Sequence, residues 1–204
     1  MRSNEPDLIH HSSFRIHHLP VMPASISEYV PQLVTDDESP RRGRVAWCAA
    51  LAGAASLVGL IVAAPLLRAA GALSAAQAIY GGFSLVCHQM SARSFHVEGF
   101  QLAVCARCTG LYVGGLLGVA VYPLARPLAR RETPDRMWLL LAALPTTLDF
   151  ALGFFGVWEN THLSRFLTAL LLGVVSAFYI VPGLVDLSLT PWRQHFRPGL
   201  PREG

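Results

Sequence analysis

The stretch Val45–Leu67, which reads VAWCAALAGAASLVGLIVAAPLL, decides the class of fold. It contains 23 uncharged residues, and a helix needs about 20 apolar residues to cross a hydrocarbon layer roughly 30 Å thick. Three further apolar runs follow, at residues 104–125, 137–157 and 166–185. The sequence therefore predicts an all-α membrane protein with four transmembrane helices at these positions.

The composition of the whole chain favours a membrane protein over a soluble one. Of its 204 residues, 52% are hydrophobic and 14% are charged, whereas soluble domains have roughly 25% charged residues. The net charge is +3, and all 16 formal positive charges are arginines, with no lysine. The arginines form short runs without interleaved aromatic residues, which argues against nucleic-acid binding. The lipid bilayer is the partner that this composition predicts, and the oligomeric state is left open.

The arginines also predict the orientation of the spans. Runs of arginine precede the first span, separate the second from the third and follow the fourth: Arg41, Arg42, Arg44, Arg126, Arg130, Arg131, Arg136, Arg193, Arg197 and Arg202. The arginines on the other side are Arg68, Arg93, Arg107 and Arg165. Because arginine-rich loops stay in the cytoplasm, we expect both termini of this multi-pass protein to be cytoplasmic, with the chain in the inner cell membrane.

The spans divide the chain into three parts. Residues 1–44 are polar and rich in proline, which predicts a disordered cytoplasmic tail. Residues 45–190 form the predicted membrane domain, and residues 191–204 a second cytoplasmic tail. Residues 69–86 are uncharged and could form a fifth span, but that would move the four-arginine loop outside. We therefore expect an interfacial or partly re-entrant helix at residues 70–86, within an extracytoplasmic, cysteine-rich loop of residues 68–104.

Three of the four cysteines lie within 22 residues, between Cys87 and Cys108. Cys105 and Cys108 stand at the start of the second span, and their i, i+3 spacing places them on one face of its first turn. The positive end of the helix dipole and the neighbouring Arg107 favour the thiolate form of both side chains. Thiolates are metal ligands and redox nucleophiles, so the CxxC pattern predicts a functional site of either kind. Cys48 stands alone in the first span and is expected to be a small packing residue.

A metal site is the first interpretation of this cluster, with zinc as the expected ion because it favours thiolate and imidazole ligands. The predicted ligands are Cys87, His88, Cys105 and Cys108. Adjacent residues rarely bind one ion together, so His88 is either the fourth ligand or a residue beside the site. His96 and His162 are expected on the same side of the membrane, so either could replace His88 as the histidine ligand.

A redox site is the second interpretation. Cys105 and Cys108 would form an exchangeable pair that Cys87 attacks, which an extracytoplasmic location permits. By analogy of architecture alone, four spans with a CxxC at an outer helix end suggest a membrane thiol–disulfide oxidoreductase with a thiol substrate and a quinone as cofactor. A static disulfide, such as one between Cys87 and Cys105, is the third interpretation.

Asp149 lies inside the third predicted span, and carboxylates at that depth usually pair or line a cavity. It is about 12 Å from the outer end of the span, at 1.5 Å per residue. We expect Asp149 and Cys108 to face one outer cavity, with Arg165 or Arg107 as counter-charge. The candidate catalytic residues are thus Cys105, Cys108, Asp149 and Arg165, with a lipid-linked substrate in the metal interpretation. An ion pair that only fixes helix packing is the alternative.

Gly110, Gly114 and Gly118 recur every four residues along the second span. Small residues at this spacing let two membrane helices approach closely. Helical rotation places this stripe roughly opposite the face that carries Cys105 and Cys108. We therefore expect the second span to contact one neighbour through glycine and to turn its thiols toward another.

Together these motifs resemble the signature of a bacterial and archaeal family of integral membrane proteins, the domain of unknown function 2085. The first block is Cys87-His88-Gln89, Arg93-Ser94-Phe95, Gly99, Val104-Cys105, Arg107-Cys108-Thr109-Gly110, Tyr112 and Gly114, and the second is Pro145, Asp149, Arg165, Thr168 and Gly173. Ala169 departs from the pattern, where glycine is expected, and Trp158–Ser164 aligns poorly. The resemblance covers residues 70–185 and implies an integral membrane protein, without assigning an activity.

Overall fold

The computed structural model describes residues 38–128 and 132–189. The predicted tails, residues 1–44 and 191–204, lie outside this range except for residues 38–44. Their predicted disorder and cytoplasmic location are therefore predictions about a part of the chain that is not described.

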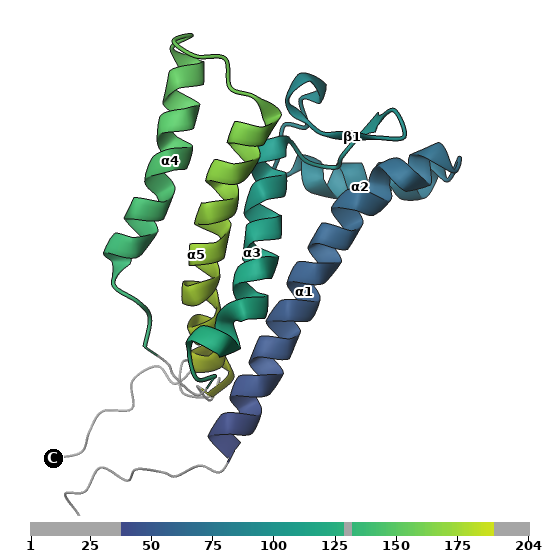
Figure 1. Ribbon diagram of the computed structural model, residues 1–204. Helices are drawn as coiled ribbons and strands as arrows, with labels where there is room; N and C mark the ends of the chain where they lie inside the picture. The colour runs from purple at the N-terminus through teal and green to yellow at the C-terminus, as the bar shows by residue number, and fades with distance from the viewer. Residues whose placement is uncertain (1–37, 129–131, 190–204) are drawn as a thin grey trace, which may run out of the picture. The chain divides into compact units, whose positions relative to one another are not determined.

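The described residues form five α-helices, one 3₁₀ turn and one two-stranded antiparallel sheet (Figure 1). In chain order these are α1 (Glu38–Ala69), α2 (Leu73–Ser84), η2 (Ser91–Arg93), β1 (His96–Val97), β2 (Phe100–Gln101), α3 (Ala106–Ala125), α4 (Arg136–Phe154) and α5 (His162–Leu189). In the sheet, His96 is opposite Gln101 and Val97 is opposite Phe100.

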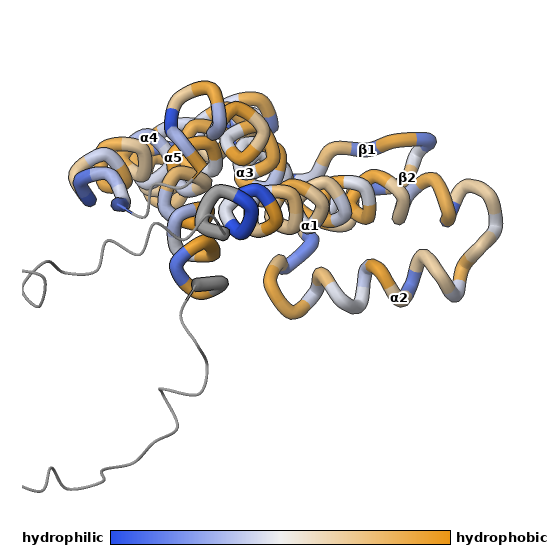
Figure 2. Tube along the Cα trace, turned by 90° about the horizontal axis from the view of Figure 1, so that it is seen from below, coloured by the Kyte–Doolittle hydropathy of each residue, from blue (hydrophilic) through white to orange (hydrophobic). Residues whose placement is uncertain are grey.

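Four of these helices are long and apolar enough to cross a membrane. Within the described residues the candidate spans are Arg41–Ala69, Ala106–Ala125, Arg136–Phe154 and His162–Leu187. Hydrophobic residues dominate along these helices (Figure 2). The predicted class, an all-α membrane protein with four spans, is confirmed.

The first helix is longer than predicted, because α1 begins at Glu38 and not at Val45. Pro40 lies in its first turn, where the missing N–H of proline costs no intrahelical hydrogen bond. The arginines that follow are good helix formers. Its arginine-rich start is therefore helical rather than part of the tail.

Two glycine turns end α1 and α4. Gly71 (φ 81°) follows α1 and Gly156 (φ 68°) follows α4. In each turn the N–H of the next residue donates to a carbonyl five residues back, Ala72 to Leu67 at 2.9 Å and Val157 to Leu152 at 3.0 Å, which is the pattern of a helix end capped by a left-handed glycine. The predicted end of the third span at residue 157 is therefore three residues too late.

The same kind of turn explains why residues 70–86 do not continue α1. After Gly71 the chain reverses into α2, whose 12 residues extend about 18 Å at 1.5 Å per residue. This is too short for a span of roughly 30 Å. α2 lies beside the last part of α1 (Figure 1). Its buried residues are Ala76 and Phe83.

α3 and α5 are packed backbone to backbone through the predicted glycine stripe. A Cβ atom at Gly110, Gly114 or Gly118 would overlap the backbone of α5. From α5, Gly173 is equally close to the backbone of α3. The predicted close approach of the second span to one neighbour is confirmed, and that neighbour is α5.

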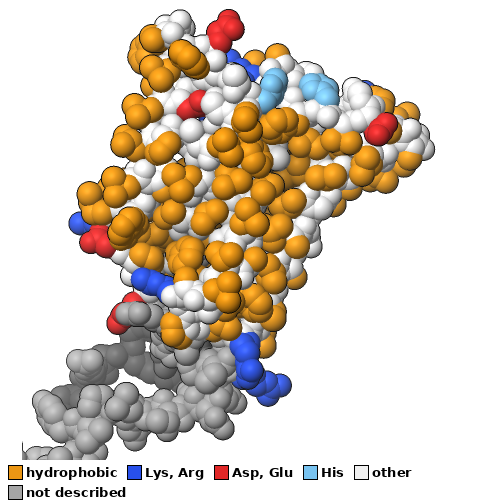
Figure 3. All heavy atoms as spheres, in the orientation of Figure 1, with side chains coloured by type: hydrophobic (Ala, Val, Ile, Leu, Met, Phe, Trp, Pro, Cys, Tyr) orange, Lys and Arg blue, Asp and Glu red, His pale blue; other side chains and the backbone are white. Residues whose placement is uncertain are grey.

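α4 is attached more loosely. Ala142 is its one buried residue, and the leucines along its outer face, such as Leu140 and Leu144, are more than half exposed. α4 contacts α5, and the two lie side by side in Figure 1. The apolar surface that covers the middle of the helices in Figure 3 is the kind of surface that lipid tails cover.

Candidate functional site

The segment between α2 and α3 is held against the helices by Gln89. Its side-chain amide donates to the carbonyl oxygens of Tyr80 at 2.7 Å and Ala103 at 2.8 Å. Its own carbonyl accepts from the amide of Gln101 at 3.1 Å, and its φ of 50° turns the chain sharply. Gln89 therefore ties the end of α2 to the residues just before α3.

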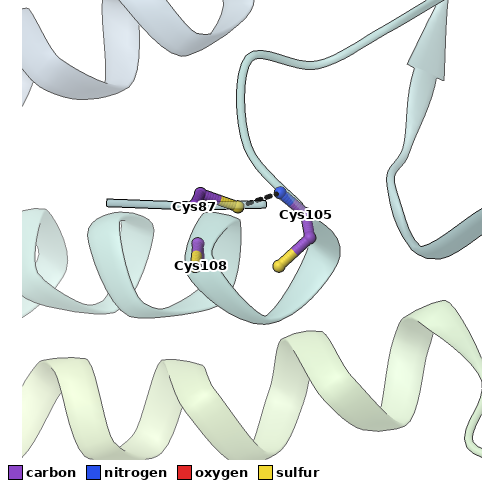
Figure 4. Close-up of side chains that lie close together, drawn as sticks. All are labelled: Cys87, Cys105 and Cys108. Carbon is purple, nitrogen blue, oxygen red and sulfur yellow. Dashed lines mark hydrogen bonds between the residues drawn. The ribbon is translucent and has the colours of Figure 1, made fainter. Parts of the chain in front are cut away.

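This tie brings the first cysteine of the sequence cluster to the other two. The sulfur atoms of Cys87, Cys105 and Cys108, here called the thiol cluster, all lie within 4.8 Å of one another. Cys87 comes from the segment after α2, Cys105 caps the start of α3, and Cys108 is in its first turn (Figure 4). All four cysteines of the chain, including the exposed Cys48, are free thiols.

Backbone N–H groups surround the buried Cys87 sulfur. The N–H of Cys105 donates to it at 3.3 Å and the N–H of Gln89 at 3.5 Å. The turn that Gln89 makes therefore directs two backbone donors at the Cys87 sulfur and holds it beside the start of α3.

The surroundings of Cys105 favour its thiolate form. A hydrogen bond with the Cys108 side chain lowers the pKa of Cys105 to about 5, with help from backbone N–H groups of the first helical turn and against burial, which raises it. A thiolate of this kind binds a metal ion or attacks a disulfide without a separate base.

The predicted imidazole ligand lies outside the thiol cluster. Among the residues that the structure describes, the group of converging ligand atoms contains three thiols and no histidine. His88 is exposed and lines the pocket next to the thiols. The substitutes have other contacts, His96 with the Ser91 hydroxyl at 3.1 Å and His162 with the ring of Phe95.

A pocket of about 210 Å³ opens beside the thiol cluster. Its wall combines thiols, guanidinium groups and apolar side chains: Val86, Cys87, His88, Gln89, Met90, Arg93, Cys105, Arg107, Cys108, Phe150 and Arg165. Two predicted catalytic candidates, Cys105 and Cys108, are thus brought together with a third, Arg165. Asp149 is not among the residues of this wall.

Asp149 reaches the site through Arg107. Its Oδ2 accepts a hydrogen bond from Nη2 of Arg107 at 2.6 Å, and its Oδ1 accepts one from the Ser164 hydroxyl at 2.9 Å. The amide of Asn160 donates to the Asp149 carbonyl oxygen. Of the two counter-charges predicted for Asp149, the structure pairs it with Arg107, which also lies 5.5 Å from the ring centre of Phe150.

Sequence reasoning missed Ser164 and Asn160, which lie in the stretch that aligned poorly with the family pattern. Their signal was weak: polar side chains at the start of a span, on the side of the membrane from which Asp149 is reached. They link the start of α5 to α4, so Asp149 joins three helices, α3, α4 and α5, at the end of the molecule that carries the thiol cluster, here called the thiol end.

Fold and site together define a multi-spanning helical membrane protein with a three-thiol site at one end of its helices. The chain belongs to the DUF2085 family of predicted membrane proteins, whose model matches residues 87–179, from the first cysteine of the cluster into α5. The family resemblance seen in the sequence is confirmed.

Two relatives from methanogenic archaea share this region. An uncharacterised protein of Methanocaldococcus jannaschii is 38% identical over 104 residues, which cover 51% of this chain and 67% of the relative. An uncharacterised protein of Methanothermobacter thermautotrophicus is 32% identical over 92 residues, which cover 45% of this chain and 81% of the relative. No solved structure matches the chain.

Proposed function

We propose that this protein binds a metal ion, zinc, through the thiolates of Cys87, Cys105 and Cys108. The observation that carries the proposal is the convergence of three sulfur atoms within 4.8 Å from two segments of the chain. Zinc bound tetrahedrally at about 2.3 Å from each sulfur needs sulfur atoms about 3.8 Å apart. A contraction of roughly 1 Å at most would therefore seat the ion.

His88, which lines the pocket beside the three thiols, or a water molecule would supply the fourth ligand, since catalytic zinc sites keep one position for water or substrate. A zinc ion held in this way would polarise a substrate oxygen or activate water. The pocket lies at the end of the spans, which suits a lipid-linked substrate, and Asp149 and Arg165 are the candidates to assist.

The proposed location is the extracytoplasmic side of the inner membrane. Arginines near the opposite end of the helices, such as Arg41 and Arg136, support this orientation because basic loops stay in the cytoplasm. A membrane-impermeant thiol reagent added to intact cells of a metal-depleted culture should then label the thiol cluster. Labelling only after permeabilisation would reverse the orientation.

A membrane thiol–disulfide oxidoreductase is the second candidate, favoured by the lowered pKa of Cys105 beside Cys108. In this reaction a substrate dithiol is oxidised to a disulfide while a Cys105–Cys108 disulfide is reduced to two thiols. The two thiols then pass two electrons and two protons to a quinone, which becomes a quinol, and the disulfide forms again.

Metal content and thiol counting separate the two candidates. The matched background is Cys48→Ala, because Cys48 is exposed on α1 and outside the thiol cluster. In the zinc-binding candidate, this variant purified in detergent carries near-stoichiometric zinc, has no reactive thiol, and releases three thiols when the metal is chelated. Metal-free protein with a reducible Cys105–Cys108 bond would overturn zinc binding and support the oxidoreductase.

A further inference from the structure

Three guanidinium groups gather at the thiol end, from three separate segments. Arg93 closes the 3₁₀ turn η2, Arg107 is in the first turn of α3, and Arg165 is in the first turn of α5. All three line the pocket beside the thiol cluster and also a smaller cavity of about 60 Å³. We call the region where these three arginines border both cavities the arginine pocket.

The charges in the arginine pocket are not balanced. Asp149 pairs with Arg107. This leaves the two guanidinium charges of Arg93 and Arg165 against the one thiolate of Cys105 on the same wall, a net excess of one positive charge. Within residues 38–128 and 132–189, the guanidinium groups of Arg93 and Arg165 have neither an ion-pair nor a hydrogen-bond partner, and Nε of Arg107 is buried without one. Arg93 is exposed and Arg165 is half-buried, so the unfavourable features are the proximity of like charges and the buried unpaired donor of Arg107. Both destabilise a fold, and a bound anion would relieve both.

We propose that the arginine pocket binds a phosphate group through Arg93, Arg107 and Arg165. The guanidinium fork matches phosphate oxygens in pairs, so arginine recognises phosphate with defined geometry. A phosphate monoester carries between one and two negative charges near neutral pH, close to the excess of positive charge in the pocket. The binding of such a group also offers oxygen acceptors to the unpaired Nε of Arg107.

The size and surroundings of the pocket suit a phosphate on a larger, partly apolar molecule. A volume of about 210 Å³ holds several water molecules, at about 30 Å³ for each. Met90, Phe150 and Phe154 line these cavities and are exposed, so the wall beside the guanidinium groups is apolar. The phosphate comes from a lipid headgroup or from a soluble phosphate compound, and the chemistry of recognition is the same.

This site does not depend on the proposed zinc ion. With zinc bound to three thiolates the metal centre carries one negative charge, and the arginine pocket together with that centre stays positive. Phosphate binding is therefore expected in both metal-loaded and metal-free protein, and its failure would leave the zinc proposal untouched.

The test uses the full chain in dodecyl maltoside and follows thermal unfolding by tryptophan fluorescence and binding by titration. The probes are inorganic phosphate, and micelles doped with phosphatidic acid or with diacylglycerol, which differ only in the phosphate. The variants are Arg93→Gln and Arg165→Gln, with Arg165→Lys to keep the charge without the fork. Arg68→Gln is the matched control, because Arg68 lies at the end of α1 over the ring of Phe100 and outside the pocket.

We expect wild type and Arg68→Gln to be stabilised by phosphatidic acid and not by diacylglycerol. Loss of one charged hydrogen-bonding partner should weaken binding about tenfold or more in Arg93→Gln and Arg165→Gln, with a smaller loss in Arg165→Lys. Stabilisation by inorganic phosphate as well would identify a soluble phosphate source, and stabilisation by the lipid alone a headgroup site. No binding of either phosphate probe, equal binding by the glutamine variants, or equal binding of diacylglycerol would overturn the proposal.

Discussion

α3 presents two different faces to the rest of the protein. One face carries Gly110, Gly114 and Gly118, which lie against the backbone of α5 along most of the helix. The other, at the first turn, carries Cys105 and Cys108 beside the pocket. The glycine face carries no reactive side chain and leaves no cavity against α5. The thiol face carries two thiols and borders a pocket. This division shows how one short helix combines the main packing contact of the domain with its candidate site.

The two faces also differ in the interactions that maintain them. The glycine face depends on backbone contact, which a single methyl group disrupts. The thiol face depends on directional polar contacts, from Gln89 on one side and from the Arg107–Asp149 pair on the other. Substitutions on the glycine face should therefore affect folding. Substitutions of the cysteines or of Gln89 should affect metal binding more than folding, and substitutions in the Arg107–Asp149 pair should affect the packing of α4.

Cys87→Ser should have the largest effect, on the thiol face alone. Loss of one of three thiolates should abolish stoichiometric zinc, because hydroxyl groups are poor zinc ligands compared with thiolates. The measurement is the ratio of metal to protein by mass spectrometry, with Cys48→Ser as the matched control that keeps its zinc. Full zinc in Cys87→Ser would show that the cluster is not the metal site.

Gly114→Ala should have the next largest effect, this time on folding. The added methyl group would overlap the backbone at Leu170, and overpacking of this kind costs about 1–3 kcal/mol. Gly115→Ala is the control on the adjacent residue, where a Cβ meets nothing within 4 Å. The free energy of unfolding in mixed micelles checks the pair, and equal stability of the two variants would mean that the glycine face is not tightly packed.

Asp149→Asn should lower the free energy of unfolding by about 1–2 kcal/mol, because it weakens the ion pair between α4 and α3. A hydrogen bond between charged groups contributes about 1.5–3 kcal/mol, and the partial exposure of Arg107, 25% for its side chain, reduces this. Ser164→Ala, which removes one neutral donor to the same carboxylate, should cost less. A double-mutant cycle with Arg107→Gln measures the coupling, and strictly additive effects would show that the pair does not interact.

Gln89→Ala should weaken zinc binding without abolishing it, a smaller effect on the metal than that of Cys87→Ser. It removes the side-chain hydrogen bonds that hold Cys87 near α3, and the loss of such supporting residues typically lowers metal affinity about 10–100-fold. Zinc competition with a chelator of known affinity measures the change. Gln77→Ala, on the exposed surface of α2, is the control. Unchanged affinity in Gln89→Ala would mean that the cluster forms without this tie.

Much of this molecule could be predicted from sequence because its signals are local. The spans follow from runs of apolar residues, the close α3–α5 approach from glycines four residues apart, and the thiol cluster from a CxxC at a helix start with a third cysteine nearby. Each of these needs only the neighbouring residues and the geometry of a helix.

The remaining features depend on residues that meet only after folding. Gln89 donates to carbonyls on two different elements, and Asn160 and Ser164 contact Asp149 from across a helix connection. The choice of Arg107 over Arg165 as the partner of Asp149 likewise depends on helix rotation. Early helix starts and glycine-capped ends, such as those at Glu38 and Gly156, shift the boundaries by a few residues because hydropathy alone does not mark them.

Zinc-edge X-ray absorption on the purified, metal-loaded protein tests the central claim most directly. Zinc bound by Cys87, Cys105 and Cys108 predicts a first shell of three sulfur atoms at about 2.3 Å and one nitrogen or oxygen at about 2.0–2.1 Å. The Cys48→Ala variant should give the same spectrum, because Cys48 lies outside the cluster. A first shell of nitrogen and oxygen alone would contradict the thiol cluster as the metal site.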